Sequence, residues 1–260
     1  MSQPNIHPTA IVDPQAKIGA DTVVGPFAII EGQVEIGSNC TIHPHAMVRS
    51  FTYISDEVSV YPYAIVGEVP QHLGYCGEES VVRIGRGSTI REYTSVHRGT
   101  KIGDMETTIG ENVLVMGYCH IAHDCHIGDR VIMANQAQLA GHVSIGDDVV
   151  IGGQVGVAQF LRVGKGAYIG GGSVLRHDMP PFVLGKGIPL TVQGTNLIGL
   201  KKLGYHSDSI QALRKIHKLF YNKKITVAQA MEMATSQGDH PPEVNYFLDF
   251  VRESKSGISR

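Results

Sequence analysis

Residues 115–145 read VMGYCHIAHDCHIGDRVIMANQAQLAGHVSI, with an aliphatic residue at every sixth position. The repeat extends toward both ends of the chain, broken twice and shifted by one residue after Ile102. A period of six fits neither an α-helix nor an ordinary β-strand, whose side chains repeat about every 3.6 and 2 residues. It predicts a β-helix built from hexapeptides. The positions of this ladder are Ile6, Val12, Ile18, Val24, Ile30, Ile36, Ile42, Val48, Ile54, Val60, Val66, Ile84, Ile90, Val96, Ile102, Ile109, Val115, Ile121, Ile127, Met133, Leu139, Ile145, Ile151, Val157, Val163, Ile169 and Leu175.

The residue two places before each ladder position is usually small or β-branched, as at Ala28, Cys40 and Ala137. Residues two apart lie on one face of a strand, so each hexapeptide should place two residues in a narrow interior. Three hexapeptides would close one coil of 3 × 6 = 18 residues, with successive coils about 4.8 Å apart. A glycine often follows the ladder residue, as in Ile36-Gly37, and we expect it to provide unusual dihedrals at the corners.

Two interruptions of the ladder, residues 67–83 and 103–108, are predicted to be loops that project from the prism. The repeat ends at Asp178-Met179-Pro180-Pro181. These limits predict a β-helix over residues 1–191 and an α-helical C-terminal domain over residues 192–260.

Three helices are expected in that C-terminal domain. Ser207 is predicted to be the N-cap of the first, and Thr226 opens the second. Pro241-Pro242 begins the third. The first and third helices also carry apolar residues at helical spacing. These are Ile210, Leu213, Ile216 and Phe220 after Ser207, and Val244, Phe247, Leu248 and Val251 after Pro242.

The composition excludes several classes of protein. A formal net charge of −2 over 260 residues argues against broad nucleic-acid binding. No apolar run is long enough to span a membrane, and the first five residues do not resemble a signal peptide. The four cysteines form no CxxC pair, and Cys40, Cys119 and Cys125 fall on interior positions. We therefore expect reduced packing cysteines and a cytoplasmic protein.

Three histidines and an aspartate lie between His120 and His126. Counting eighteen residues per coil stacks His123 under Gly141 and Gln159, and Asp124 under His142. A histidine beside a carboxylate can act as a general base, and the N–H of Gly141 could reach a developing oxyanion.

This constellation favours acyl transfer. Two alternatives stay open: a metal site formed by the histidines, and solvated histidines on the outer face of a repeat. No GxSxG motif is present and no interior cysteine is placed as a nucleophile, so direct transfer to a bound hydroxyl is favoured over a covalent intermediate.

Over essentially its whole length the chain resembles the UDP-N-acetylglucosamine O-acyltransferases of lipid A biosynthesis. The segments that carry this resemblance are Ile6–Val12, Val96-His97-Arg98-Gly99-Thr100, His120-Ile121-Ala122-His123-Asp124-Cys125, Leu139-Ala140-Gly141-His142-Val143, Pro180-Pro181 and Asn196–Gly204.

The resemblance implies transfer of a 3-hydroxyacyl chain from acyl carrier protein to the 3-hydroxyl of UDP-N-acetylglucosamine. In that scheme His123 deprotonates the hydroxyl, Asp124 orients His123, and the Gly141 amide stabilises the oxyanion. It also implies a left-handed coil, a homotrimer with active sites between neighbouring prisms, and no metal or organic cofactor. The residues expected to bind substrate are Gln71, His72, His120, His142, Gln159, Asn196 and Lys202.

Several residues depart from the family's pattern. His72 and Gly74 stand where the family often has an acidic residue and a lysine, Ala158 replaces a histidine, and Leu203 replaces the second residue of an arginine pair. One hypothesis is that the acceptor is the 3-amino analogue of the sugar nucleotide, which would give an amide.

Two further roles are expected. Gly171 falls where the family gauges acyl length, and its lack of a side chain leaves room for a longer chain. Arg214 and Lys218 lie on one predicted helix, which is either a solvated face or a docking site for an acidic carrier protein.

Four rival functions remain at this point. They are the N-acyltransferase of the same pathway, a coenzyme A-dependent acetyltransferase, a metal-dependent enzyme of the carbonic anhydrase type, and a scaffold without catalysis.

Overall fold

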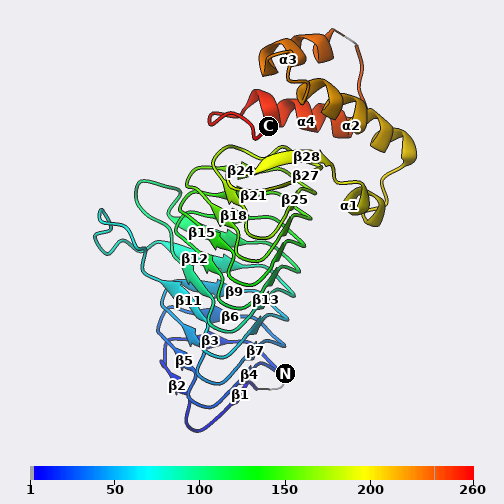
Figure 1. Cartoon of the computed structure of the whole chain (residues 1–260). Coiled ribbons are helices and arrows are strands. Elements are labelled where there is room, and N and C mark those ends of the chain that lie inside the picture. The colour runs from blue at the N-terminus through cyan, green and yellow to red at the C-terminus, as the bar shows by residue number, and fades with distance from the viewer. Residues whose placement is uncertain (1–2, 237) are drawn as a thin grey trace.

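The computed structural model describes residues 3–236 and 238–260 and shows a long prism with helices at its C-terminal end (Figure 1). In successive coils the chain passes through three sheets, from sheet A to sheet B to sheet C. Strands of successive coils pair in parallel with a register of 18 residues over most of the prism, as in His120 with Gln138 and His126 with Ser144. The result is the predicted left-handed parallel β-helix.

Most strands are two residues long because the hexapeptide leaves only that length between corners. Sheet A contains β1 (Asn5–Ile6), β4 (Val23–Val24), β7 (Thr41–Ile42), β10 (Ser59–Val60), β13 (Thr89–Ile90), β16 (Leu114–Val115), β19 (Ile132–Met133), β22 (Val150–Ile151), β25 (Tyr168–Ile169), β27 (Val183–Lys186) and β28 (Thr191–Thr195). Sheet B contains β2 (Ile11–Val12), β5 (Ile29–Ile30), β8 (Met47–Val48), β11 (Ile65–Glu68), β14 (Ser95–His97), β17 (His120–Ile121), β20 (Gln138–Leu139), β23 (Gly156–Val157) and β26 (Val174–Leu175). Sheet C contains β3 (Lys17–Ile18), β6 (Glu35–Ile36), β9 (Thr52–Ile54), β12 (Val81–Ile84), β15 (Glu106–Ile109), β18 (His126–Ile127), β21 (Ser144–Ile145) and β24 (Arg162–Val163).

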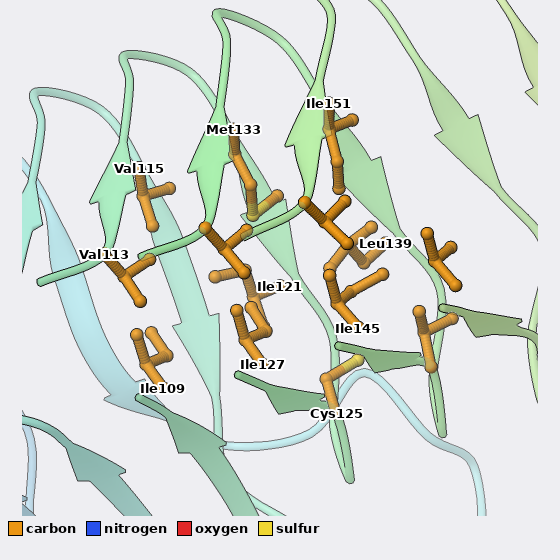
Figure 2. Close-up of a cluster of buried hydrophobic side chains, with 14 of the residues drawn as sticks. Ile109, Val113, Val115, Ile121, Cys125, Ile127, Met133, Leu139, Ile145 and Ile151 are labelled. Carbon is orange, nitrogen blue, oxygen red and sulfur yellow. The ribbon is translucent and has the colours of Figure 1, made fainter. Parts of the chain in front are cut away.

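The interior of the prism is filled by the ladder residues and by the residues two places before them, as predicted, except at Ile102, which lies outside the strands and is 69% exposed. Figure 2 shows Ile121, Cys125 and Ile127 pointing into this interior, and all three are almost completely buried. The first coil is different, because Ile6 is 40% exposed. A solenoid coil buries its core against its neighbours, and the first coil has a neighbour on one side only.

The glycines that follow the ladder residues serve a different purpose from the predicted one. The left-handed dihedrals fall two residues later in the repeat, at non-glycine positions such as Asn39 (φ 57°) and Arg130 (φ 55°). Gly37 and Gly128 instead allow close approach of the next coil. A Cβ atom at Gly128 would lie 2.7 Å from the backbone nitrogen of Asp147, which is a steric clash. The expectation of unusual glycine dihedrals at these positions was therefore wrong.

The edge between sheets A and B carries a column of stacked aromatic rings, which we call the A–B ladder. Adjacent ring centroids are 4.8–5.1 Å apart and the planes are within 18° of parallel. All five residues have positive φ, and all are exposed to solvent in the single chain. The members of the A–B ladder are Phe27, His45, Tyr63, Tyr93 and Tyr118.

Two segments leave the prism where the ladder is interrupted, with limits that differ from the predicted ones. The first lies between β11 and β12, over residues 69–80, and projects from the side of the prism in Figure 1. The second lies between β14 and β15, over residues 98–105. The first segment is shorter than predicted, and the second ends earlier, because β11, β12 and β15 are four residues long instead of two. The second segment begins earlier than predicted because Ile102 is not a ladder residue: it lies in this segment and is 69% exposed.

The C-terminal part begins with a strand and not with a helix. β28 pairs antiparallel with β27, and α1 (Leu197–Lys202) follows directly. The sequence patterns did not indicate α1, which is only six residues long. The three expected helices are α2 (Ser207–Phe220), α3 (Val227–Thr235) and α4 (Pro242–Arg252).

The start of α2 corrects a prediction. His206 is its N-cap and makes no side-chain capping bond, whereas Ser207 is the first helical residue. Thr226 does cap α3, through a capping box with Gln229. No helix among the described residues is long and apolar enough to cross a membrane.

Candidate active site

The corner between sheets B and C carries the histidine cluster, in the segment that joins β17 to β18. The eighteen-residue stacking predicted for this corner is present: His142 N–H donates to the His123 carbonyl (3.0 Å), and Phe160 N–H donates to the Gly141 carbonyl (3.1 Å). Asp124, His142 and Phe160 share positive φ values of 57°, 62° and 64°. Coil stacking thus brings together residues that are 18 positions apart in the sequence.

His123 and Asp124 form a hydrogen-bonded pair. The distance from His123 Nδ1 to Asp124 Oδ2 is 2.8 Å, and Asp124 is 2% exposed. An ionised carboxylate can only accept hydrogen bonds, so it holds the proton of a neutral His123 on Nδ1. The other ring nitrogen, Nε2, is then free to accept a proton from a substrate.

Gly141 lies directly against the imidazole of His123. A Cβ atom at this position would be 2.5 Å from Cε1 and 2.7 Å from Nε2 of His123. The Gly141 N–H donates to no acceptor within residues 3–236 and 238–260. A glycine therefore gives His123 room for its ring and leaves an N–H beside it.

Two more aromatic contacts enclose His123. The His72 ring, from the segment 69–80, meets it edge-on with centroids 5.2 Å apart, and the His142 ring does so at 5.0 Å. His142 in turn stacks on Phe160 at 4.5 Å. Burial lowers the pKa of His142, although the Asp124 carboxylate, 3.8 Å from its Nε2, acts in the opposite direction.

A second pair of histidines continues the site along sheet B. His120 Nδ1 is 2.8 Å from Ser95 Oγ, and its ring meets His97 edge-on at 4.7 Å. Burial, followed by the neighbouring His123, lowers the pKa of His120. Burial also lowers the pKa of His97 to about 4. These two imidazoles are therefore neutral near neutral pH, when they can both donate and accept hydrogen bonds.

The structure does not gather the three histidines of residues 120–126 into one metal site. His126 points from sheet C, where its Nε2 is 3.0 Å from Asp104 Oδ2 and its Nδ1 is 3.0 Å from Thr108 Oγ1. Among the described residues, the group with three potential ligand atoms within 4.8 Å of one another is His123, Asp124 and His142. The metal arrangement considered from the sequence spacing was therefore wrong about His126.

The other predicted substrate-binding residues make no hydrogen bond or ring contact with His123 among the described residues. Gln71 is exposed in the segment 69–80, and Gln159 is exposed next to Phe160. Asn196 caps α1: its side chain accepts from Gly199 N–H (3.0 Å) and donates to the Gly166 carbonyl (3.0 Å). Both ends of its amide are thus used inside the chain.

The remaining predicted positions lie on other surfaces. Lys202 ends α1, and Gly171 is exposed at the corner between sheets A and B. Arg214 and Lys218 are on α2 and line a shallow hollow of about 200 Å³ together with Gln211 and Lys215.

A larger hollow of about 640 Å³ lies on the charged outer face of sheet C and contains no histidine. We place the active site at His123 and not in the larger hollow, because the His123–Asp124 pair can act as a general base.

His97 and Thr100 were not identified as site residues from their sequence pattern. Thr100, in the segment 98–105, donates its backbone N–H and its hydroxyl to the Asp124 carboxylate. It lies 24 positions before Asp124, outside the regular ladder, so the eighteen-residue arithmetic could not place it there. Only its occurrence in the stretch Val96–Thr100, which carries the family resemblance, pointed to this region.

Known proteins resemble this chain over nearly its full length. Residues 178–259 match the family described as "Udp N-acetylglucosamine O-acyltransferase; Domain 2", and residues 4–50 and 106–141 match "Bacterial transferase hexapeptide (six repeats)". The acyl-[acyl-carrier-protein]--UDP-N-acetylglucosamine O-acyltransferase of Sulfurihydrogenibium sp. (strain YO3AOP1) is 54% identical over 254 residues, which cover 98% of this chain and 94% of the relative.

Solved structures agree with these relatives. LpxA from Acinetobacter baumannii is 41% identical and superposes with a TM-score of 0.95 over 98% of this chain and 99% of that one. The UDP-N-acetylglucosamine acyltransferase from Campylobacter jejuni is 36% identical, with a TM-score of 0.93 over the same shares. Identity at this level along nearly the whole of each chain shows that the protein belongs to the UDP-N-acetylglucosamine O-acyltransferase family, as its resemblance predicted.

Proposed function

We propose that this protein transfers a 3-hydroxyacyl chain from acyl carrier protein to the 3-hydroxyl of UDP-N-acetylglucosamine, the first step of lipid A biosynthesis. The observation that carries the proposal is the His123–Asp124 pair beside the Gly141 N–H, which has no acceptor among the described residues. Family membership supplies the donor and the acceptor, since the relatives carry both in their names.

The geometry supports a single displacement with His123 as the general base. Nε2 of His123 takes the proton of the sugar 3-hydroxyl as its oxygen attacks the thioester carbon. The Gly141 N–H stabilises the resulting oxyanion. When the intermediate collapses, the carbon–sulfur bond breaks, and the departing thiolate receives the proton from His123. Asp124 keeps the imidazole in the required tautomer and compensates its transient positive charge.

We further propose that the active protein is a homotrimer in which neighbouring prisms share each site. The A–B ladder supports a contact between copies, because Phe27 and Tyr118 are 54% and 53% exposed and belong to a continuous aromatic stripe. Sheet C is a poorer contact surface, since its outer face carries exposed ion pairs such as Lys17 with Glu35.

A site shared between two copies also explains why Gly171, Asn196 and Lys202 lie on other surfaces of one chain than His123 does. Gly171 lies at the A–B corner and His123 at the B–C corner, on two different edges of one prism. If the A–B edge of one copy faces sheet B of the next, Gly171 of the first copy borders the cleft at His123 of the second. Gly171 then gauges the acyl chain, and Asn196 and Lys202 belong to the sugar-nucleotide side of a shared cleft.

The carrier protein is proposed to dock on α2. Arg214, Lys215 and Lys218 line one hollow of that helix, and an acidic partner would be attracted to it. Charge reversal at Arg214 and Lys218 should raise the KM for the carrier substrate and remove its dependence on salt, while kcat stays unchanged. The unpaired cysteines agree with a cytoplasmic location, which we include in the proposal.

The test of the function is a transfer assay with a series of 3-hydroxyacyl carrier proteins and both sugar nucleotides, hydroxyl and 3-amino, read by mass spectrometry. We expect acylation of the hydroxyl sugar, lost by a factor of about 10³ or more in His123→Ala. Product from the amino sugar alone would overturn the proposed acceptor. Activity that disappears on chelation and returns with zinc would overturn the metal-free mechanism.

A further inference from the structure

Within residues 3–236 and 238–260, Thr100 is the residue that hydrogen-bonds the Asp124 carboxylate in addition to His123. The Thr100 N–H donates to Oδ1 (2.9 Å) and Oδ2 (3.1 Å), and the Thr100 hydroxyl donates to Oδ2 at 2.6 Å. Oδ2 is the same oxygen that faces His123 Nδ1. Thr100 is 1% exposed, so its donors meet the carboxylate without competition from water.

The segment 98–105 is shaped to bring Thr100 to this place. The Thr100 carbonyl accepts hydrogen bonds from Gly103 N–H (3.1 Å) and Met105 N–H (3.3 Å), which fold the segment into a tight turn. Gly103 packs so closely on Asp124 that an added Cβ would overlap its carboxylate. Turn and carboxylate therefore form one packed unit.

The loop that carries His72 is tied to this turn by Glu78. Glu78 Oε1 accepts the N–H of Lys101, the residue after Thr100, at 3.0 Å, and Oε2 accepts the Cys76 N–H at 2.8 Å. These backbone donors lower the pKa of Glu78, which keeps it ionised as an acceptor. At the other end of the loop, the Gly74 N–H donates to His72 Nδ1 at 3.0 Å.

We propose that Thr100 is a positioning residue of the transfer reaction: its two donors fix the Asp124 carboxylate in the orientation that holds the proton of His123 on Nδ1. Without the hydroxyl, Thr100 gives Oδ2 only the longer N–H bond, and the carboxylate can rotate away from the imidazole. The base then spends less time in the tautomer with Nε2 free. This inference rests on the proposed role of His123 and adds a residue that touches no substrate.

The test compares Thr100→Val and Thr100→Ser in the full-length protein. Valine keeps the shape and the N–H but removes the hydroxyl, so we expect kcat to fall about 10- to 100-fold while KM for both substrates changes less than about twofold. Serine restores the hydroxyl and should return kcat to within about threefold of the parent. If Thr100→Val does not fold, Thr100→Ala replaces it in the same comparison.

Thr94→Val is the matched control. Thr94 is equally buried, and its hydroxyl donates to the Met116 carbonyl (3.0 Å), away from Asp124. We expect this variant to lose stability but to keep its kcat. A Thr100→Val enzyme that keeps kcat within about twofold, while His123→Ala is inactive, would overturn the inference and leave the proposed function intact.

A second readout does not depend on activity. In protein labelled with ¹⁵N-histidine, the His123 signal, assigned by its loss in His123→Ala, reports which ring nitrogen carries the proton. We expect the Nδ1–H form to dominate in the parent and in Thr100→Ser, and to decline in Thr100→Val. An unchanged tautomer in Thr100→Val would contradict the inference even if no transfer were detected in any variant.

Discussion

A single methyl group at Gly141 would occupy the space that the His123 imidazole fills. The added carbon would stand 2.5 Å from Cε1, so the ring must turn and lengthen its bond to Asp124. We expect Gly141→Ala to lower kcat about 100-fold with little change in the melting temperature, because a displacement near 1 Å is enough to misalign a general base.

Gly156→Ala provides the comparison for that variant. Gly156 lies on β23 of sheet B, and a Cβ there meets no atom within 4 Å. Its kcat should match that of the parent. Equal activity in the two variants would show that the close contact at Gly141 does not control His123.

His97 makes folding depend on pH. Its pKa is about 4 in the folded chain against 6.5 in the unfolded chain, so between these values the unfolded chain binds more protons. Stability should therefore be fully present above about pH 6.5 and fall as pH drops toward 4. One such group accounts for about 2 kcal/mol between pH 7.5 and pH 5.

Urea unfolding at these two pH values, at one protein concentration, measures that difference. His97→Leu should reduce it by about 2 kcal/mol, whereas His7→Leu, which alters an exposed histidine in the first coil, should leave it unchanged. The lowered pKa values of His120 and His142 act in the same direction and should account for a residual slope. An unaltered pH dependence in His97→Leu would refute the assignment.

The residues of the site divide into those that periodicity could locate and those it could not. His123, Gly141 and His142 follow from counting eighteen residues per coil. Thr100 and Glu78 sit in segments that leave the repeat, where the course of the backbone depends on contacts with Asp124 and Lys101 and not on a period.

At the level of the coil, glycine sets the spacing between neighbouring elements. A Cβ at Gly128 would lie 2.7 Å from the Asp147 nitrogen and 2.5 Å from its Oδ1. Both atoms belong to a rigid turn of the next coil, so the two coils must separate. We expect Gly128→Ala to destabilise the prism by about 2 kcal/mol, near the usual cost of overpacking, as measured by urea unfolding.

Gly153→Ala is a milder change of the same kind, since its nearest neighbour would be the Asn135 carbonyl oxygen at 3.2 Å. Gly153→Ala should lower the free energy of unfolding by less than Gly128→Ala does. A larger loss of stability in Gly153→Ala than in Gly128→Ala would mean that close approach of the coils is not the reason for glycine at these corners.

The helical elements show which local signals are decisive. Thr226 was expected to open a helix, and its capping box with Gln229 satisfies two backbone donors of α3. At α2 the serine was misplaced by one residue, because His206 already has extended dihedrals and Ser207 continues into the helix. Residue preferences indicate that a helix starts near a given residue, but they do not determine which of two adjacent residues is the N-cap.

For the whole molecule, the proposed trimer is tested by placing a charge on the A–B ladder. Tyr93→Asp suits this purpose, since aspartate tolerates the left-handed conformation that Tyr93 adopts (φ 60°). A buried, unpaired carboxylate at the contact between copies should dissociate the trimer and reduce transfer. Sedimentation velocity at several concentrations gives the oligomeric state.

Asn112→Asp adds the same charge at a left-handed, exposed position on the edge between sheets C and A. We expect it to remain trimeric and active. If Tyr93→Asp also stays trimeric, the A–B ladder is not the contact, and the ring stack serves only to join successive coils.

The sequence by itself determined the prism, because apolar residues that recur at every sixth position can be buried in no other regular structure. It also determined the composition of the His123 corner, since a constant coil length converts sequence distance into spatial neighbourhood. Only the tertiary structure decided how Thr100 and Glu78 reach that corner, why glycine follows the ladder residues, and that Asn196 is a cap. These features depend on distances between backbone segments with no common period, and such distances exist only after the coils have stacked.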